Sequence, residues 1–163
     1  MSLRMFGMVI RVISIIAAST FFISSAHAKE TKQPPVSVET LRAIQTRIYI
    51  YPPEKIISII LNVLADQGYV IDSVDRSAGL INANKVGSSR QSMAGLNVRQ
   101  NTDLLNIIVS AEGEMSSSVR INIIDRYQYN YLGKPYKDEK TQITMPEKYD
   151  AIFNAIDQKI KSK

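Results

Sequence analysis

The chain of 163 residues has no cysteine and no tryptophan, and its single histidine is His27. The lack of cysteine excludes disulfides and a thiolate nucleophile. Zinc sites use cysteine or histidine in almost all cases, and histidine is the most frequent general base. The side chains that remain for chemistry are carboxylates, lysines, arginines and tyrosines. We therefore expect a protein that holds no metal and no cofactor and is not an enzyme.

The segment 1–28 predicts a secretory signal peptide. Arg4 provides the positive start, a mostly apolar run extends from Val12 to Ser24, and small side chains follow at Ala26 and Ala28. Crossing a bilayer takes ~20 apolar residues, so the shorter run favours cleavage after Ala28 over a retained membrane anchor. No cysteine is present to carry a lipid. We expect a periplasmic or secreted protein without a lipid anchor.

Cleavage would leave the segment 29–163 and remove Arg4, Arg11 and the only histidine, which lowers the net charge from +5 to +3. This charge is too small and too scattered to indicate nucleic-acid binding. It is compatible with weak attraction to an anionic lipid or glycan. The length corresponds to one domain that is large enough to bury a core. We expect a flexible leader at 29–40 and a single domain at 41–163.

Two segments at the start of this domain have clear periodicity. The stretch from Leu41 to Tyr51 alternates with period two and predicts a half-buried strand that buries Ile44, Ile48 and Ile50. A helix follows, because prolines open it and apolar residues recur at helical spacing up to about Gln67. Ile59 lies at the margin of the polar side of this helix. We expect it to be half exposed, either as an isolated surface residue or as a contact to a partner.

The remaining elements complete an α+β domain. Short links between neighbouring strands indicate hairpins, and the last apolar stripe at helical spacing follows Pro146. The stretch from Gly87 to Asn101 is polar and predicts a long loop, and Lys134 to Lys140 predicts a charged excursion. The predicted fold is a two-layer sandwich with a mainly antiparallel sheet, in the order β-α-β-β-β-β-α, with both helices on one face. The four later strands are expected at 69–75, 80–86, 102–111 and 119–131.

Tyr127, Tyr129 and Tyr131 form the first candidate site, because they share one face of the last expected strand. Such a ladder can stack on sugar rings or grip an apolar peptide. The alternative is that the tyrosines extend the core face of the strand into half-solvated positions, for which tyrosine is well suited.

Arg90 and Arg99 form the second candidate, within the long polar loop. Arginine forks and backbone N–H groups in a loop can hold a phosphate or sulfate. The spacing matches no phosphate-loop motif, so a solvated loop is the favoured interpretation.

Paired carboxylates are the third candidate, and they carry the hypothesis of a hydrolase that uses carboxylates alone. Asp72 with Asp75 and Glu112 with Glu114 are close in sequence and lie in or beside hairpin turns. Glycosidase carboxylates normally come from distant parts of a cleft. We therefore expect these residues to solvate turns.

Three sequence runs resemble a family of small Gram-negative envelope proteins, some of which are lipoproteins encoded beside multidrug efflux operons. These runs are QTRIY at 45–49, VLADQGYVI at 63–71 and GLINANK at 79–85, and PEKY at 146–149 is similar to the family's closing helix. The resemblance implies the fold and an envelope role. It implies no catalytic residue, and the chain departs from the lipoprotein members because it lacks cysteine.

These observations lead to two hypotheses of different classes. The first is an exported, non-enzymatic binding or accessory module of the bacterial cell envelope that acts through protein contacts. The second is a secreted effector that binds host surfaces or anionic lipids. Ile59, Arg90, Arg99, Tyr127, Tyr129 and Tyr131 are the expected partner-binding residues.

Overall fold

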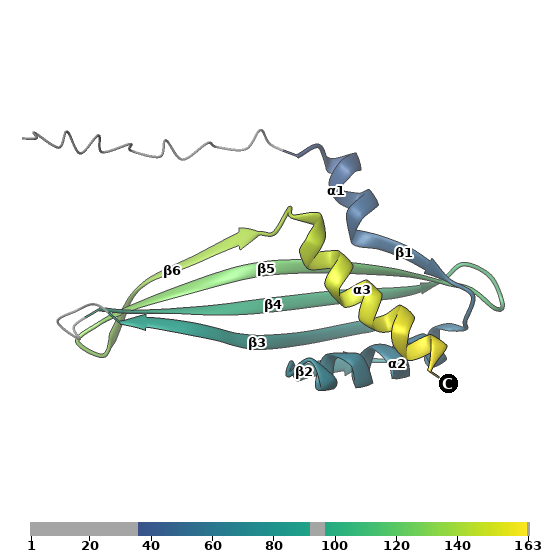
Figure 1. Cartoon of the computed structure of the whole chain (residues 1–163), viewed down its shortest axis with the longest axis horizontal. Coiled ribbons are helices and arrows are strands. Elements are labelled where there is room, and N and C mark those ends of the chain that lie inside the picture. The colour runs from purple at the N-terminus through teal and green to yellow at the C-terminus, as the bar shows by residue number, and fades with distance from the viewer. Residues whose placement is uncertain (1–35, 92–96, 163) are drawn as a thin grey trace, which may run out of the picture. The chain divides into compact units, whose positions relative to one another are not determined.

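The computed structural model describes residues 36–91 and 97–162 (Figure 1). The expected signal peptide at 1–28 and the leader up to residue 35 lie outside the described residues. Helix α1 (Val38–Gln45) begins within the stretch expected to be leader. Ser37 caps it, because its hydroxyl accepts a hydrogen bond from the Thr40 N–H at 3.1 Å.

Six strands form one antiparallel sheet, which confirms the predicted fold class. Their order across the sheet is β1-β5-β4-β3-β2, and β6 pairs with β5 on the same side as β1, further along β5. The predicted order β-α-β-β-β-β-α is present, with α1 added before it and β6 added before the last helix. The strands are β1 (Thr46–Tyr49), β2 (Val70–Asp75), β3 (Leu80–Gln91), β4 (Asn97–Ala111), β5 (Ser117–Tyr131) and β6 (Lys134–Gln142).

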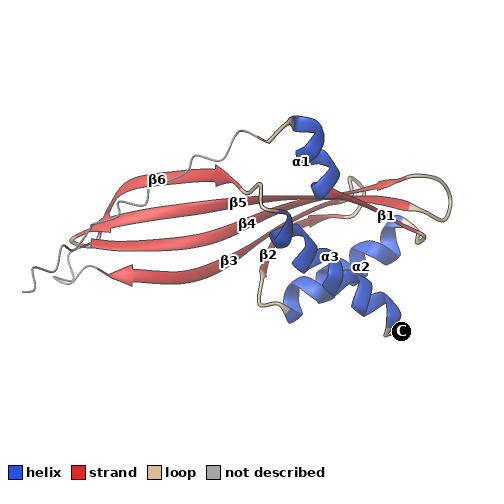
Figure 2. Ribbon diagram, turned by 45° about the horizontal axis from the view of Figure 1, so that its top comes forward, coloured by secondary structure: helices blue, strands red, loops and turns tan. Residues whose placement is uncertain are grey.

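Helices α2 (Pro53–Asp66) and α3 (Pro146–Lys161) cover the same face of the sheet, as predicted (Figure 2). Prolines at the first turns suit both helix starts, since their missing N–H groups would have no partner there. Gly68 follows α2 with a φ of +80°, a conformation that glycine adopts at little cost. The core between the layers is aliphatic and aromatic, and its largest fully buried side chains include Tyr149, Phe153, Ile56, Leu105 and Ile121.

The prediction that Ile59 is half exposed is wrong, because this side chain is only 1% exposed. A single apolar stripe would leave Ile59 at its margin. Helix α2, however, contacts both the sheet and α3, so its buried face is wider than one stripe. Ile59 therefore contributes to the core and is removed as a partner-binding candidate.

The first predicted strand is also wrong in part. Residues up to Gln45 are helical, and β1 begins only at Thr46. Tyr49 is buried, whereas Ile48 and Ile50 are 70% and 82% exposed. The buried and exposed faces are thus the reverse of the prediction, which is the consequence of a one-residue shift in a strand of period two.

Arg47 explains this reversal. Its guanidinium group lies 4.6 Å from the centre of the Phe153 ring and forms ion pairs with Asp150 at 2.7 Å and Asp157 at 3.0 Å. All three partners lie on one side of α3. The face of β1 that carries Arg47 and Tyr49 is therefore held against the helices.

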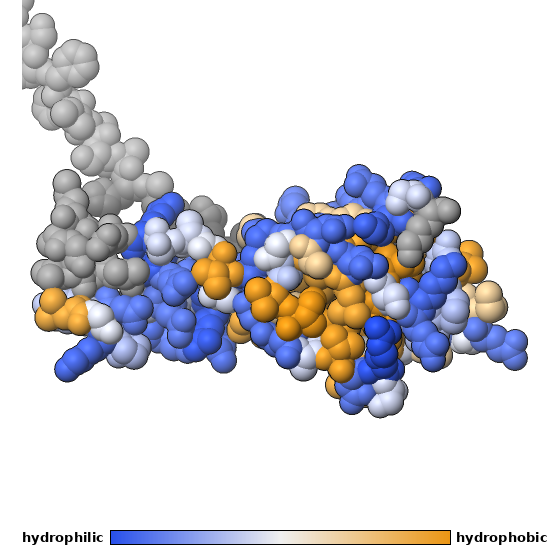
Figure 3. Space-filling view, turned by 90° about the horizontal axis from the view of Figure 1, so that it is seen from below, coloured by the Kyte–Doolittle hydropathy of each residue, from blue (hydrophilic) through white to orange (hydrophobic). Residues whose placement is uncertain are grey.

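The helices cover only one end of the sheet. Beyond Ala83, Leu105 and Ile123, the strands β3 to β6 continue past the helices (Figures 1 and 2). Only the first row of this continuation, with Lys85 and Asp103, still lies beside α3, at Lys148 and Ala151. We call this part the arm and define it as residues 85–91, 97–103, 125–131 and 134–141. Its surface is mostly hydrophilic in the view of Figure 3, where apolar side chains gather over the end that holds the helices.

Two further predictions, both for segments of the arm, are wrong. The expected loop from Gly87 to Asn101 consists largely of strand, because β3 extends to Gln91 and β4 begins at Asn97. Only 92–96 lie outside the described residues in this stretch. The charged excursion expected from Lys134 to Lys140 is strand β6. Polar strands of this kind lack the apolar alternation by which strands are recognised in a sequence.

The reversed face of β1 predicts unequal effects of two isoleucine substitutions. Ile48→Ala should change the free energy of unfolding by no more than about 0.5 kcal/mol, since the side chain is exposed. Ile121→Ala should cost about 2–5 kcal/mol, because it leaves a cavity in the core. Urea unfolding measures both. A loss at Ile48 as large as that at Ile121 would contradict the observed orientation of β1.

Candidate functional site

The strand register places the polar candidates on one face of the arm. At the other end of the sheet, the helices cover this same face. Arg90 lies opposite Arg99, Arg99 lies opposite Tyr129, and Tyr129 lies opposite Lys137. A row of cations and one aromatic ring thus crosses four strands. Tyr127 belongs to the neighbouring row, because successive side chains on one face are two residues apart.

The structure therefore joins two candidates that the sequence presented separately. Arg90 and Arg99 belong to neighbouring strands rather than to a loop, and Arg99 lies beside both Tyr127 and Tyr129. Tyr131 lies at the end of β5, is 48% exposed and does not line the hollow described next. We call the face that carries Arg90, Arg99, Tyr127 and Tyr129 the basic–aromatic face.

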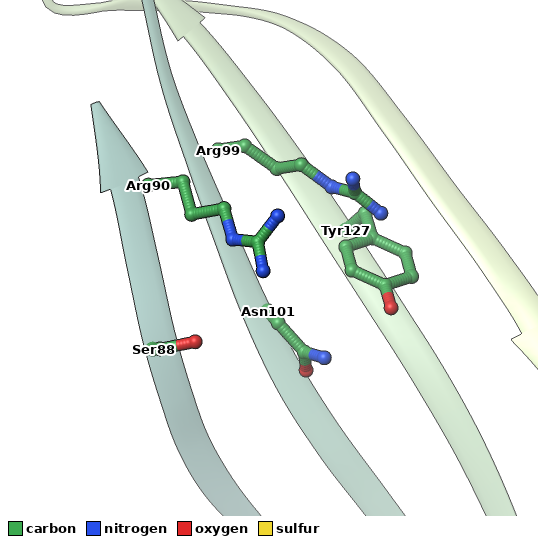
Figure 4. A pocket seen from close by; sticks show the side chains of 5 residues that line it. All are labelled: Ser88, Arg90, Arg99, Asn101 and Tyr127. Carbon is green, nitrogen blue, oxygen red and sulfur yellow. The ribbon is translucent and has the colours of Figure 1, made fainter. Parts of the chain in front are cut away.

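A hollow of about 280 Å³ lies on this face. Figure 4 shows the side chains of three neighbouring strands around it. A β-bulge between Val86 and Ser89 shifts the register of β3 here. The lining residues are Ser88, Arg90, Arg99, Asn101 and Tyr127.

The tyrosine rings of this face are covered by cations. The Arg99 guanidinium carbon lies 3.9 Å from the centre of the Tyr127 ring and 5.6 Å from that of Tyr129. The Lys137 ammonium lies 5.5 Å from the Tyr129 ring, and the Tyr136 ring lies 6.0 Å from it. Cation–π contacts of this kind fix the arginine and occupy the ring faces. Stacking of Tyr127 or Tyr129 on a sugar ring would therefore compete with these cations, while Tyr131 has no such contact among the described residues and is 48% exposed.

Arg90 and Arg99 are like charges placed directly opposite each other, an arrangement that destabilises a strand pair. Within the part of the chain that the structure describes, neither arginine forms an ion pair. Arg126, on the opposite face of the arm, differs because it forms an ion pair with Asp138 at 2.6 Å. The hollow thus concentrates positive charge that the described carboxylates leave without a direct partner.

A second charged row lies between the hollow and the core, and the sequence analysis missed it. Asp103 lies opposite Asp125 on β5 and opposite Lys85 on β3. Burial raises the pKa of Asp103 above its ordinary value, and the nearby Asp125 adds to this effect, while Lys148 and Lys85 oppose it. The two aspartates lie on different strands and far apart in the sequence, so only the strand register could have revealed the pair.

The carboxylate pairs predicted from the sequence have structural roles where contacts are described. Asp75 accepts hydrogen bonds from the Ala78 N–H at 2.9 Å and the Ser77 hydroxyl at 2.6 Å within the β2–β3 turn. These bonds lower the pKa of Asp75. Asp72 accepts a hydrogen bond from the Asn84 side chain at 2.6 Å.

The comparisons with known proteins place the chain in no family. No protein-family profile and no curated protein matches the chain. One similar solved structure is a DUF4468 family protein from Bacteroides ovatus, with a TM-score of 0.39 and 10% sequence identity over 77% of this chain and 88% of that one. Within residues 36–91 and 97–162, no helix is long and apolar enough to span a membrane. In those same segments no group of three or more histidine, cysteine or acidic residues could hold a metal ion.

Removing one of the facing arginines should not weaken the fold. Arg90→Gln relieves the repulsion from Arg99, so the free energy of unfolding should rise by about 0.2–1 kcal/mol. Sodium chloride should stabilise the original protein more than the variant, because salt screens exposed charges. Urea unfolding at two salt concentrations measures both effects. The matched control is Arg76→Gln in the β2–β3 turn, and a clear loss of stability at Arg90 alone would show that Arg90 has a stabilising partner.

The raised pKa of Asp103 predicts a pH-dependent effect. In the folded state this carboxyl keeps its proton to higher pH than in the unfolded chain. Its favourable contribution is therefore present in acid and is lost as the pH rises through the folded pKa. Asp103→Asn should stabilise the protein at pH 7, and this gain should vanish below the ordinary carboxyl range near pH ~3.9.

Urea unfolding between pH 3 and pH 7 checks this effect, with Asp75→Ala as a control of opposite sign. Because the pKa of Asp75 is lowered in the fold, its loss should cost stability at neutral pH and cost less in acid. A destabilised Asp103→Asn protein at pH 7 would contradict the account.

Proposed function

We propose that this protein is an exported, non-enzymatic binding module of the bacterial cell envelope, and that the basic–aromatic face of the arm is its contact surface. One observation carries the proposal. The strands extend past the helices and place Arg90 and Arg99 together on a surface that contributes nothing to the aliphatic core. Export is supported by the sequence of the segment 1–28, and the envelope role by the family resemblance.

The chemistry of the hollow supports binding over catalysis. Arginine stays charged in proteins and offers five N–H donors. Interaction with the Asp125 carboxylate raises the pKa of Tyr127, and burial adds to this, so the Tyr127 hydroxyl stays protonated. The lining therefore offers hydrogen-bond donors and fixed positive charge, and its described residues include no carboxylate or imidazole that could act as a general base.

The charge pattern favours a protein partner over an anionic membrane. Asp103 and Asp125 lie in one row of the face with a single lysine, Lys85, and Arg90 and Arg99 lie in another row. A uniformly anionic membrane surface would attract the arginines and repel the aspartates. A protein can place opposite charges against each row, which is the usual basis of complementarity at interfaces. Binding of host surfaces or anionic lipids by a secreted effector is the alternative.

Cell fractionation combined with a charge reversal tests this proposal. We expect the mature chain, beginning near Lys29, in the periplasmic fraction and within a complex larger than the free protein. Arg99→Glu should release it from that complex, because it reverses the charge at the centre of the face. Arg76→Glu is the control with the same change of net charge and should leave the complex intact. Unprocessed protein in the cytosol would contradict export, and free protein in the culture medium would favour the effector alternative.

A further inference from the structure

We infer that the hollow between Arg90 and Arg99 recognises a carboxylate side chain on an extended segment of a partner protein, and that the same segment carries a basic side chain for Asp103 and Asp125. This inference rests on the proposed function and names the chemistry of its partner. Four observations support it: the facing arginines, the size of the hollow, an unsatisfied buried oxygen and the order of charges along the arm.

The facing arginines form a place for a counter-charge. Arg90 and Arg99 come from neighbouring strands, line the same hollow and form no ion pair within the described segments. A carboxylate between two guanidinium groups accepts hydrogen bonds from both, and such charge-assisted bonds are among the strongest in proteins. The contact of Arg99 with the Tyr127 ring holds one of the two groups in place before a ligand arrives.

The hollow is large enough to take a side chain. Its volume of about 280 Å³ lies just below the range of roughly 300–1,000 Å³ that is usual for pockets of drug-sized ligands. It is open along the surface of the sheet, so a chain can pass over it and insert one side chain. Arg99 lies over the Tyr127 ring and Lys137 over the Tyr129 ring, so a stacked saccharide would compete with these cations.

An unsatisfied acceptor distinguishes a peptide from a simple anion. Asn101 Oδ1 is buried and has no hydrogen-bond partner among the described residues. A buried acceptor without a partner is costly, and Asn101 lines the hollow, so a donor from the ligand would relieve this cost when the amide turns toward it. A peptide brings backbone N–H groups next to its carboxylate, whereas sulfate brings only acceptors and phosphate at neutral pH brings only one or two hydroxyl donors.

The order of charges along the arm predicts how far apart the acidic and the basic side chain lie in the partner segment. Arg99 and Asp103 lie four residues apart on β4, which is roughly 14 Å along an extended chain. Asp125, opposite Asp103, also has a buried oxygen, Oδ1, without a hydrogen-bond partner in the described part of the chain. An extended segment with a glutamate and a lysine four positions apart would meet both rows at once.

Nuclear magnetic resonance of the full-length protein with a synthetic peptide tests this inference. The probe is acetyl-Ser-Glu-Thr-Ser-Thr-Lys-Ser-amide, and the readout is the side-chain Nε–Hε signals of Arg90 and Arg99. We expect saturable shifts of both signals. Replacing the peptide's glutamate by glutamine should weaken binding at least tenfold, as should Arg90→Gln in the protein. Arg76→Gln is the matched control and should leave the affinity unchanged.

Separate titrations distinguish the other sources of negative charge. Inorganic phosphate, trigalacturonate and vesicles containing phosphatidylglycerol should each shift these signals less than the peptide does at equal concentration. Peptide binding that is unchanged by Arg90→Gln, or tighter binding of any of the three other probes, would overturn the inference. Failure of the peptide while the cellular complex still depends on Arg99 would reject the carboxylate chemistry and leave the proposed function in place. Site-specific peptide binding without any cellular complex would support the carboxylate chemistry and reject the proposed function.

Discussion

The helix-facing side of the central strands changes from aliphatic to charged residues, and this change determines where the helix layer can cover the sheet. Up to Ala83, Leu105 and Ile123 the side chains on this face are buried and apolar. Two positions further along, Asp103 and Asp125 replace them. A helix packed over these carboxylates would have to desolvate charge, at a cost of several kcal/mol for each unpaired group, as a rough expectation. Strand pairing needs no such burial, because the backbone hydrogen bonds are the same for any side chain. The sheet therefore continues as an arm whose face is uncovered beyond the row of Asp103, which still borders α3.

The arm is stabilised by cross-strand contacts instead of a core. On the face opposite the hollow, Arg126 forms hydrogen bonds with both carboxylate oxygens of Asp138 at 2.6–3.1 Å. On the basic–aromatic face, the Tyr129 hydroxyl donates to Glu139 at 3.1 Å. Pairs of this kind contribute about 0.2–1 kcal/mol each, enough to hold a sheet that is anchored to a packed domain at one end. Facing arginines in such a marginal structure work against its stability, which is the physical reason to assign them to binding. Residues that serve the fold alone would more readily be paired.

The sequence predicted those parts of the structure that depend on local periodicity. The α+β class, the antiparallel sheet and the two helices on one face all follow from apolar spacing within single elements. The reversed face of β1 could not be predicted, because Arg47 is oriented by carboxylates that lie near the other end of the chain. The burial of Ile59 depends on a second contact surface that one helical stripe does not reveal. Arg90, Arg99 and Tyr127 were candidates from the sequence, whereas Ser88 and Asn101 were not, and the meeting of these residues in one hollow required the register of three strands.

The central claim is that one face of the arm makes the functional contact, and two adjacent positions on β5 can separate the faces. Tyr129 lies on the basic–aromatic face and Gln128 on the opposite one, because neighbouring residues of a strand point to opposite sides. A photoreactive phenylalanine analogue placed at each position in growing cells would record what lies next to each face. The account predicts a crosslinked protein partner from position 129 that is absent from position 128. An equally strong product from position 128, or a product from that position alone, would contradict it.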